Sequence, residues 1–149
     1  MKITTTRFGE VEAGEDTLIH FPMGVPGFPH LKRFFVIEYR DAIKWLQAVD
    51  DGDIAFIVTD PFLLFPDYAF TVKDDVEQFL QIRNPADVVV LVILTVSDEK
   101  VTANLRAPLV VNASNRRAFQ LLLDDDRYAF RVPLPAPLKE SDREAAASA

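Results

Sequence analysis

The sequence contains no cysteine and few glycines. Without cysteine the chain has no disulfide, no thiol nucleophile and no thiolate ligand for a metal, and this composition suits a reducing cytoplasm. Five glycines in 149 residues leave no glycine-rich loop of the kind that cradles a phosphate group. The two histidines, His20 and His30, have no further metal ligand at suitable spacing. We therefore expect a protein without a metal or an organic cofactor.

Long hydrophobic runs are also absent. The longest run, residues 88–96, has about half of the ~20 residues that a membrane-spanning helix needs. The first residues lack the apolar stretch of a secretory signal peptide. These absences predict a soluble, cytoplasmic protein that does not enter a membrane.

Catalytic signatures are missing too. No serine lies in a Gly-x-Ser-x-Gly turn, so a serine triad is not predicted. Aspartates gather in two clusters; the first begins like a calcium loop, but Pro61 stands where a bidentate glutamate is required. We interpret both clusters as solvated turns and predict no enzymatic activity. The first acidic cluster comprises Asp50, Asp51 and Asp53, and the second comprises Asp124, Asp125 and Asp126.

The charge balance is strongly negative. Lys and Arg number 16 and Asp and Glu number 23, so the formal net charge is −7. A surface of this sign repels the phosphate backbone of nucleic acids and attracts basic proteins. We expect no direct contact with nucleic acid, and the charge favours a basic partner instead.

Short apolar runs separated by turn residues predict a mostly β fold. Ten prolines interrupt the chain, and β-branched and aromatic residues fill the segments between them. The continuous run at 88–96 is typical of a central strand buried on both faces. Apolar residues at helical spacing predict a helix over 74–80, with Asp74 as its cap. Strands are expected at residues 3–6, 17–21, 34–37, 45–49, 54–58, 69–72, 88–96, 101–105, 109–111 and 118–123.

Together these elements predict one small antiparallel β-barrel-like domain with one or two short helices. The domain covers residues 1–134. Acidic turns are expected to join the first two strands around Gly14, and the fourth and fifth strands through residues 50–53. Residues 135–149 hold proline, charged residues and alanine without a core-forming pattern, which predicts a mobile tail.

Two proline-rich segments hold more apolar side chains than a strand can bury. Residues 24–29 combine two glycines and two prolines around Phe28, and residues 60–68 carry large apolar side chains between two prolines. Proline lacks an amide donor, so neither segment suits a central strand. Neighbouring side chains of an extended chain point to opposite faces, so residues 62–65 cannot all be buried. Either both loops plug the ends of a barrel or they form an exposed surface for a partner.

Four short motifs occur in a fixed order along the chain. They are GVPGF (24–28), DPFL (60–63), FPDY (65–68) and TANLRAP (102–108), with Asn112 after the last. In order and spacing they resemble the flagellar assembly factor FliW family over residues 3–134. The structural positions of these motifs are expected to be Gly24, Pro26, Gly27, Pro61, Asn104, Pro108 and Asn112.

The resemblance implies a non-enzymatic protein with two competing partners. One is flagellin, which is bound through its C-terminal region. The other is CsrA, a homodimeric RNA-binding repressor that blocks translation of flagellin mRNA. When flagellin is secreted, the freed assembly factor sequesters the repressor and flagellin synthesis resumes. The simplest picture is a monomer that joins each protomer of the repressor dimer.

These partners suggest which residues form the contact surfaces. A helical segment of flagellin with an apolar stripe needs a hydrophobic groove. The two acidic clusters are expected to attract the basic repressor and to oppose the approach of RNA. Asn104 and Asn112 are expected to hold turns by hydrogen bonds from side chain to backbone. The groove is expected from Phe62, Leu63, Phe65 and Tyr68, with Phe28 at its margin.

A small-ligand or carbohydrate-binding β-barrel is the alternative interpretation. In that case Trp45 and the phenylalanines line a closed cavity with convergent polar groups. An exposed apolar groove favours the binding of a protein instead. A hydrolase built on His20 and the carboxylates is a more distant alternative.

Overall fold

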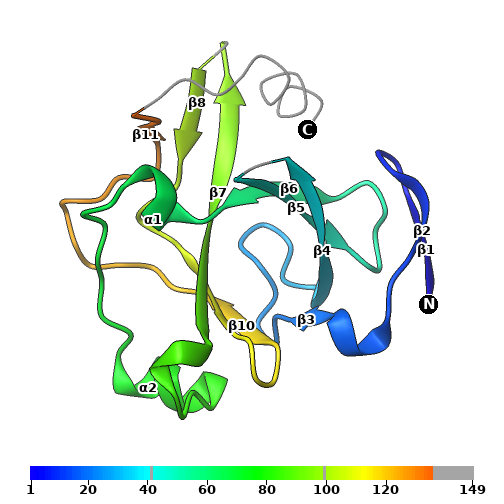
Figure 1. The fold of residues 1–149 in the computed structure, drawn as a ribbon, viewed down its shortest axis with the longest axis horizontal. Helices are drawn as coiled ribbons and strands as arrows, with labels where there is room; N and C mark the ends of the chain where they lie inside the picture. Colours follow the sequence, from blue (N-terminus) through cyan, green and yellow to red (C-terminus); the bar gives the residue numbers. More distant parts are fainter. Residues whose placement is uncertain (41, 99, 136–149) are drawn as a thin grey trace.

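The chain folds around a ring of hydrogen-bonded β-strands (Figure 1). The computed structural model describes residues 1–40, 42–98 and 100–135, so the predicted tail lies outside the described residues from position 136 on. The helices are α1 (Pro61–Leu64) and α2 (Asp74–Leu80), with 3-10 turns at η1 (Glu15–Thr17) and η2 (Pro85–Asp87). The strands are β1 (Lys2–Thr5), β2 (Gly9–Glu12), β3 (Ile19–His20), β4 (Arg33–Arg40), β5 (Ile43–Ala48), β6 (Ala55–Thr59), β7 (Val88–Ser97), β8 (Lys100–Ala103), β9 (Leu109–Asn112), β10 (Arg117–Gln120) and β11 (Val132–Pro133).

Strand β7 closes the ring. One edge of β7 pairs with β6, while on the other edge residues 88–91 pair with β9 and residues 94–97 pair with β8. From β7 the order runs through β6, β5, β4, β3, β10 and β9 back to β7. These pairings are antiparallel except for the short contact between β3 and β10. A mostly β, barrel-like antiparallel fold is therefore confirmed.

Three clusters of buried apolar side chains stabilise this ring. The first, around Trp45, Leu80 and Val92, packs helix α2 onto the strands. The second gathers around Phe34, and the third seats the separate β1–β2 hairpin through Ile3. Because alternate strand residues point to opposite faces, each strand contributes every second side chain to such a cluster.

The central strand β7 is buried only in its middle. Val90, Leu91 and Val92 are buried, whereas Val89 and Thr95 near its two ends are exposed. The neighbouring strand β6 pairs only with residues 92–94, so the ends of β7 extend beyond it. The prediction of burial on both faces therefore holds for the middle of the strand alone.

Two predicted strands differ from the structure. Residues 69–72 form no strand, because no other segment pairs with their backbone among the described residues. Residues 17–21 contain only the short β3, and β1 pairs with the unpredicted β2 instead. The Thr5 hydroxyl closes that first hairpin early, since it accepts from the N–H of Phe8 and donates to the carbonyl of Gly9.

Helix α2 occupies the predicted residues, but its N-terminus differs. Lys73 holds the cap position without a side-chain hydrogen bond, and Asp74 is already the first helical residue. The aspartates of the first turn instead face the positive end of the helix dipole. In the part of the chain that the structure describes, no helix has the length and hydropathy needed to cross a membrane.

Candidate protein-binding surfaces

Helix α1 presents two apolar side chains to solvent. The carboxylate of Asp60 accepts a hydrogen bond from the N–H of Phe62 (2.9 Å), and Pro61 stands at the first helical position, where a missing N–H costs nothing. On this fixed turn Phe62 and Leu63 remain 43% and 65% exposed. Phe65 is half-buried and packs against the first core cluster. Of the predicted groove, Phe62 and Leu63 are thus available to a partner, and we call this pair the α1 patch.

Tyr68 belongs to the core rather than to that surface. Its ring is buried, and its hydroxyl donates a hydrogen bond to the carbonyl oxygen of Leu105 (2.7 Å). Burial raises the pKa of the Tyr68 hydroxyl above its ordinary value, because the charged form would lose its hydration. The ring lies 5.8, 5.5 and 4.7 Å from the rings of Phe62, Phe70 and Tyr128. Tyr68 therefore anchors the segment between α1 and α2.

Phe28 lies in a different core cluster from the α1 patch. It is half-buried, with its ring 6.0 Å from that of Phe56, and neighbouring Val25 is buried. Its ring pairs with those of His30 and Phe56, and among the described residues no aromatic pair joins it to Phe62 of α1. The structure therefore does not bring Phe28 to the margin of the predicted groove.

The segment 24–29 requires glycine at positions 24 and 27. The N–H of Phe28 donates to the carbonyl of Val25 (2.8 Å) across Pro26 and Gly27, and Gly27 has a φ of +86°. Proline followed by a residue of positive φ is the pattern of a type II turn. Gly24 also has a positive φ, and a Cβ there would lie 2.5 Å from a backbone oxygen. These motif residues fix the loop on the core.

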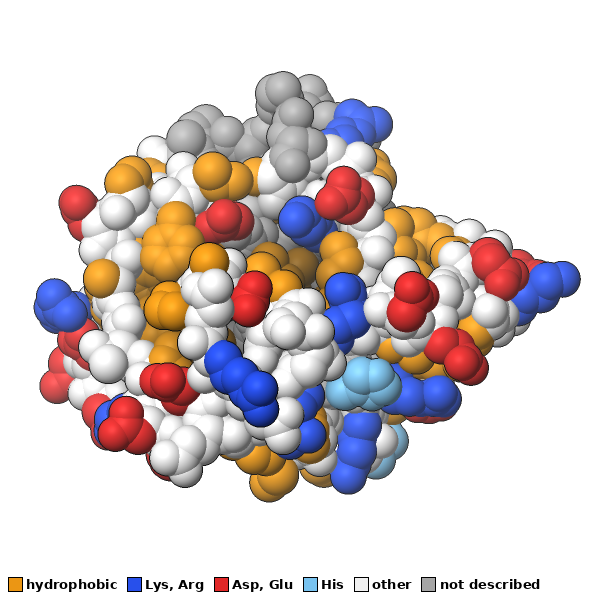
Figure 2. All heavy atoms as spheres, turned by 60° about the horizontal axis from the view of Figure 1, so that its bottom comes forward, with side chains coloured by type: hydrophobic (Ala, Val, Ile, Leu, Met, Phe, Trp, Pro, Cys, Tyr) orange, Lys and Arg blue, Asp and Glu red, His pale blue; other side chains and the backbone are white. Residues whose placement is uncertain are grey.

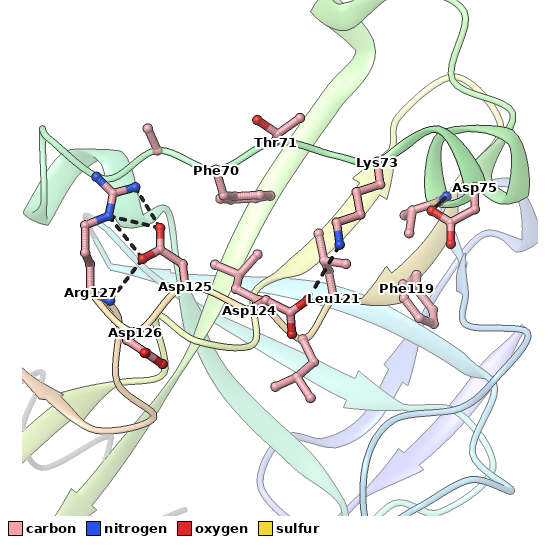
Figure 3. Close-up of a pocket in the computed structure, with 14 residues that line it drawn as sticks. Phe70, Thr71, Lys73, Asp75, Phe119, Leu121, Asp124, Asp125, Asp126 and Arg127 are labelled. Carbon is pink, nitrogen blue, oxygen red and sulfur yellow. Dashed lines mark hydrogen bonds and ion pairs between the residues drawn. The ribbon is translucent and has the colours of Figure 1, made fainter.

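The structure shows a large hollow that was not predicted, which we call the groove. It has a volume of about 1010 Å³ and lies between residues 69–73 and residues 121–127 (Figure 3). Phe70, Phe119 and Leu121 contribute to its apolar lining, while Leu122 at its rim is 63% exposed. In Figure 2, apolar side chains lie in a hollowed face among acidic and basic ones.

Two smaller hollows continue the groove. They measure about 300 and 260 Å³, and Phe119 lines all three. Met23, which is 64% exposed, lines the two smaller ones. The sequence held a signal for this surface: residues 118–123 read AFQLLL, which places apolar side chains on both faces of a predicted strand. Ala118, Leu121 and Leu123 enter the core from the two faces, and Leu122 is the apolar side chain that stays exposed.

The first acidic cluster forms the predicted turn between β5 and β6. Asp50 pairs with Arg33 (2.5 Å), and this hydrogen bond lowers the pKa of the Asp50 carboxyl. Asp51 accepts from the N–H of Asp53 (3.0 Å), and Asp53 accepts from the hydroxyl of Thr6. Within the described part of the chain, Asp51 and Asp53 have no ion-pair partner. They remain sources of negative field.

Each carboxylate of the second acidic cluster faces a cation. A hydrogen bond from Arg127 lowers the pKa of Asp125. Because three cations offset three carboxylates, the cluster contributes less negative field than the sequence suggested. The ion pairs are Asp124–Lys73 (3.6 Å), Asp125–Arg127 (2.7 Å) and Asp126–Arg106 (3.4 Å).

The remaining motif residues hold the backbone through hydrogen bonds: Asn104 and Asn112 in turns, and Pro108 at the end of the β9–β10 ladder. The side-chain oxygen of Asn104 accepts from the N–H of Ala107 (3.0 Å), and the carbonyl of Pro108 accepts from the N–H of Leu121 (2.9 Å). Asn112 is buried. Its side-chain nitrogen donates to the carbonyl of Leu80, and its side-chain oxygen accepts from the N–H of Ser114. In each case the structure shows bonds that hold the backbone.

Trp45 lies in the core rather than in a cavity. Its ring contacts Phe8, with the centroids 5.6 Å apart, and it lines none of the hollows described above. Among the described residues, no group of three or more His, Asp or Glu side chains is placed to hold a metal ion. Among the described residues, Trp45 thus packs in the core and not against any of these three hollows, whereas the ligand-binding alternative expected it to line a cavity.

Comparison with known families bears on all these residues. A family model described as FliW protein matches residues 2–134. The chain belongs to the FliW family. The match includes both acidic clusters, the α1 patch and the groove, so each surface lies within the FliW domain.

Individual FliW proteins match nearly the whole chain. The flagellar assembly factor FliW of Caldanaerobacter subterraneus subsp. tengcongensis is 38% identical over 95% of this chain and 97% of its own length. That of Thermoanaerobacter pseudethanolicus is 40% identical over the same shares. A crystal structure of the flagellar assembly factor FliW superposes with a TM-score of 0.85 at 34% identity, covering 91% of this chain and 98% of its own. The resemblance to FliW and the fold it implies are thereby confirmed.

Proposed function

We propose that this FliW-family protein acts in the cytoplasm by binding flagellin and CsrA in competing complexes. In the complex with CsrA it relieves the repression of flagellin translation. In the complex with flagellin it chaperones the newly made subunit and leaves CsrA free to repress. The protein acts by binding rather than catalysis, as a monomer in its free state, and it makes no direct contact with nucleic acid.

The observation that carries this proposal is the α1 patch. The side chains of Phe62 and Leu63 are exposed on a helical turn whose backbone is fixed by the Asp60 cap and by Pro61. Covering apolar surface yields about 25 cal/mol per Å², and a preformed patch loses little conformational freedom when it is covered. A flagellin helix with an apolar stripe is a suitable occupant.

The charge of the chain supports CsrA as the second partner. An RNA-binding repressor exposes basic side chains, and a protein of net charge −7 attracts such a surface over distance. Asp51 and Asp53, which lack cation partners in the described structure, add to this field. The same field opposes RNA once the two proteins are docked.

Calorimetric titration tests the proposal. The purified protein is titrated with CsrA of its own organism, and the titration is repeated after saturation with flagellin. We expect tight binding of CsrA that flagellin abolishes. Binding of neither partner, with all three proteins shown to be folded, overturns the proposed function. Simultaneous binding of both overturns the competition.

A further inference from the structure

We propose that the β1–β2 hairpin, which we call the latch (residues 2–12), opens and closes over Trp45 while the ring of strands stays folded. This inference goes beyond the proposed function, because it concerns a movement of the protein's own chain. The latch forms a two-stranded sheet of its own and lies to one side of the ring (Figure 1). A two-stranded hairpin alone is at most marginally stable in water. Its contacts with the ring therefore decide whether it stays in place.

Few hydrogen bonds join the latch to the ring. Within the described part of the chain, its one backbone hydrogen bond to the ring runs from the N–H of Thr6 to the carbonyl of Gly52 (3.1 Å). The Thr6 hydroxyl donates to the carboxylate of Asp53, and the Arg7 guanidinium donates to the Asp53 carbonyl (3.4 Å). These bonds all reach the turn between β5 and β6. The latch is thus fastened at its own turn, whereas its two strands pair only with each other.

Two side chains of the latch turn cover the single tryptophan of the chain. The guanidinium carbon of Arg7 lies 5.1 Å from the ring centroid of Trp45, and the ring of Phe8 meets it edge-on at 5.6 Å. Trp45 is only 2% exposed in this arrangement. Further along the latch, Ile3 shares a buried cluster with Phe35 of β4. Opening the latch therefore uncovers an apolar face of β4 and β5.

The covered junction leaves polar atoms without hydrogen bonds. Nε1 of Trp45, Nε of Arg7 and Oε1 of Gln47 are buried and have no partner among the described residues. Gln47 belongs to this junction, because its Nε2 donates to the same Gly52 carbonyl (3.2 Å) that accepts from Thr6. A buried donor or acceptor without a partner costs free energy, and contact with water removes that cost. The latch therefore opens more easily than a junction whose polar atoms are all paired.

Closure of the latch depends on a close backbone approach at Gly52. A Cβ at this position would overlap the carbonyl oxygen of Thr4 and crowd the Cα of Thr5. Gly52 has no positive φ, so its backbone conformation also suits alanine. Because Gly52 lies outside the latch, an added methyl group opposes closure without altering the latch itself.

Amide hydrogen exchange of Gly52→Ala tests the inference. In the wild type we expect Ile3 and Val11, which pair across the latch, to exchange at least about tenfold faster than Val92 in the ring, because local opening exposes them without global unfolding. Gly52→Ala should speed exchange at both latch amides about tenfold further and leave Val92 within about twofold of wild type. Gly14→Ala, whose Cβ would meet only side-chain atoms, is the matched control and should exchange as the wild type does.

An engineered disulfide gives the second test. The chain has no cysteine and the side chains of Thr6 and Asp53 are in contact, so the double substitution Thr6→Cys, Asp53→Cys supplies a single pair. Oxidation should slow exchange at the latch amides and reduce the quenching of Trp45 fluorescence by acrylamide, and reduction should reverse both. The wild type carried through the same oxidation is the control. Mass spectrometry shows whether the bond has formed.

Faster exchange confined to the latch in Gly52→Ala, together with its slowing on oxidation of the double variant, supports the inference. Equal acceleration at the latch amides and at Val92 would show that latch and ring unfold as one unit, and it overturns the inference. Equal exchange of the oxidised and reduced double variant overturns it as well. Failure of the disulfide to form contradicts the closed contact between positions 6 and 53 and has the same consequence. None of these measurements involves flagellin or CsrA, so the proposed function and the latch stand or fall separately.

Discussion

The side-chain nitrogen of Asn112 lies 2.9 Å from the carbonyl oxygen of Leu80, so a strand residue closes the end of helix α2. The same nitrogen donates to the carbonyl of Gln81 (3.1 Å), and the side-chain oxygen accepts from the N–H of Ser114 (3.0 Å). The last carbonyls of a helix have no partner within it. One buried amide thus joins α2 to the turn after β9.

Replacing Asn112 should destabilise the fold strongly. Asn112→Ala leaves the carbonyls of Leu80 and Gln81 and the N–H of Ser114 without this partner, and we expect the free energy of unfolding to fall by about 2–3 kcal/mol. Asn115 also donates to Leu80 (3.0 Å) but is exposed, so Asn115→Ala should cost about 0.5 kcal/mol. Urea unfolding measures both variants. Equal losses would show that the burial of Asn112 is not the cause.

The Tyr68 hydroxyl should contribute to stability because its acceptor is buried. Tyr68→Phe leaves the carbonyl of Leu105 without this donor, and we expect a loss of about 1–2 kcal/mol in unfolding free energy. Tyr128→Phe is the control, since the hydroxyl of Tyr128 bonds to the exposed Ala69 and water can replace it. A smaller loss for Tyr68→Phe than for this control would contradict the prediction.

The Asp50–Arg33 pair should make stability depend on acid. The folded pKa of Asp50 lies below its ordinary value of 3.8, so the pair stabilises the fold above that value and stops doing so as pH falls through the folded pKa. Both side chains are partly exposed, so we expect Asp50→Asn to cost at most about 1 kcal/mol at neutral pH.

Thermal unfolding of wild type and Asp50→Asn across the acid range checks this. The difference in Tm should shrink below about pH 4 and vanish once Asp50 is protonated in both states. Asp51→Asn, which removes a charge without an ion pair, is the control. A difference for Asp50→Asn that persists in strong acid would rule out the pair as its source.

The α1 patch should determine the affinity for flagellin. Leu63→Glu places a charge where an apolar side chain of flagellin would pack, and we expect the Kd for flagellin to rise about tenfold or more. The exposure of Leu63 means that Tm should stay unchanged. Phe130→Glu, at an exposed apolar residue outside both surfaces, is the matched control in the same titration. Equal affinity of the two variants would exclude the patch.

The first acidic cluster should attract CsrA through its two unpaired carboxylates. We expect the double substitution Asp51→Asn, Asp53→Asn to weaken CsrA binding and to reduce its dependence on salt, because screening acts on the same charges. Neutralising Asp124 and Asp126 should have a smaller effect, since each already faces a cation. Titrations at two salt concentrations measure both effects. An unchanged affinity and salt dependence for the first variant would contradict the hypothesis.

The predictable parts of the fold are those that depend on neighbours along the chain. The turn at residues 50–53 and the strands on either side follow from local turn chemistry and alternation. The strand predicted at 69–72 did not form, although its side chains alternate as in a strand, because a ladder needs a second segment beside it. Nothing within those four residues specifies such a partner.

The candidate surfaces were also predictable only where they depend on neighbouring residues in the sequence. The excess of apolar residues at 60–68 predicted that residues 62–65 cannot all be buried, and the structure leaves Phe62 and Leu63 exposed. It did not separate them from Tyr68, whose burial depends on an acceptor at Leu105, 37 positions along the chain. The groove was missed because its walls come from two segments that are far apart in sequence.

The sequence alone determined the family, the alternating strands, the overall negative charge and the surplus of apolar residues between prolines. The tertiary structure decided which of those residues stay in solvent and which charges remain unpaired. Lys73 and Arg106 reach the second acidic cluster only after the chain has folded, whereas Arg127 lies two residues from its partner Asp125. The physical reason is that propensity and total charge are properties of the chain itself. Burial and ion pairing depend instead on residues that meet only when β7 closes the ring.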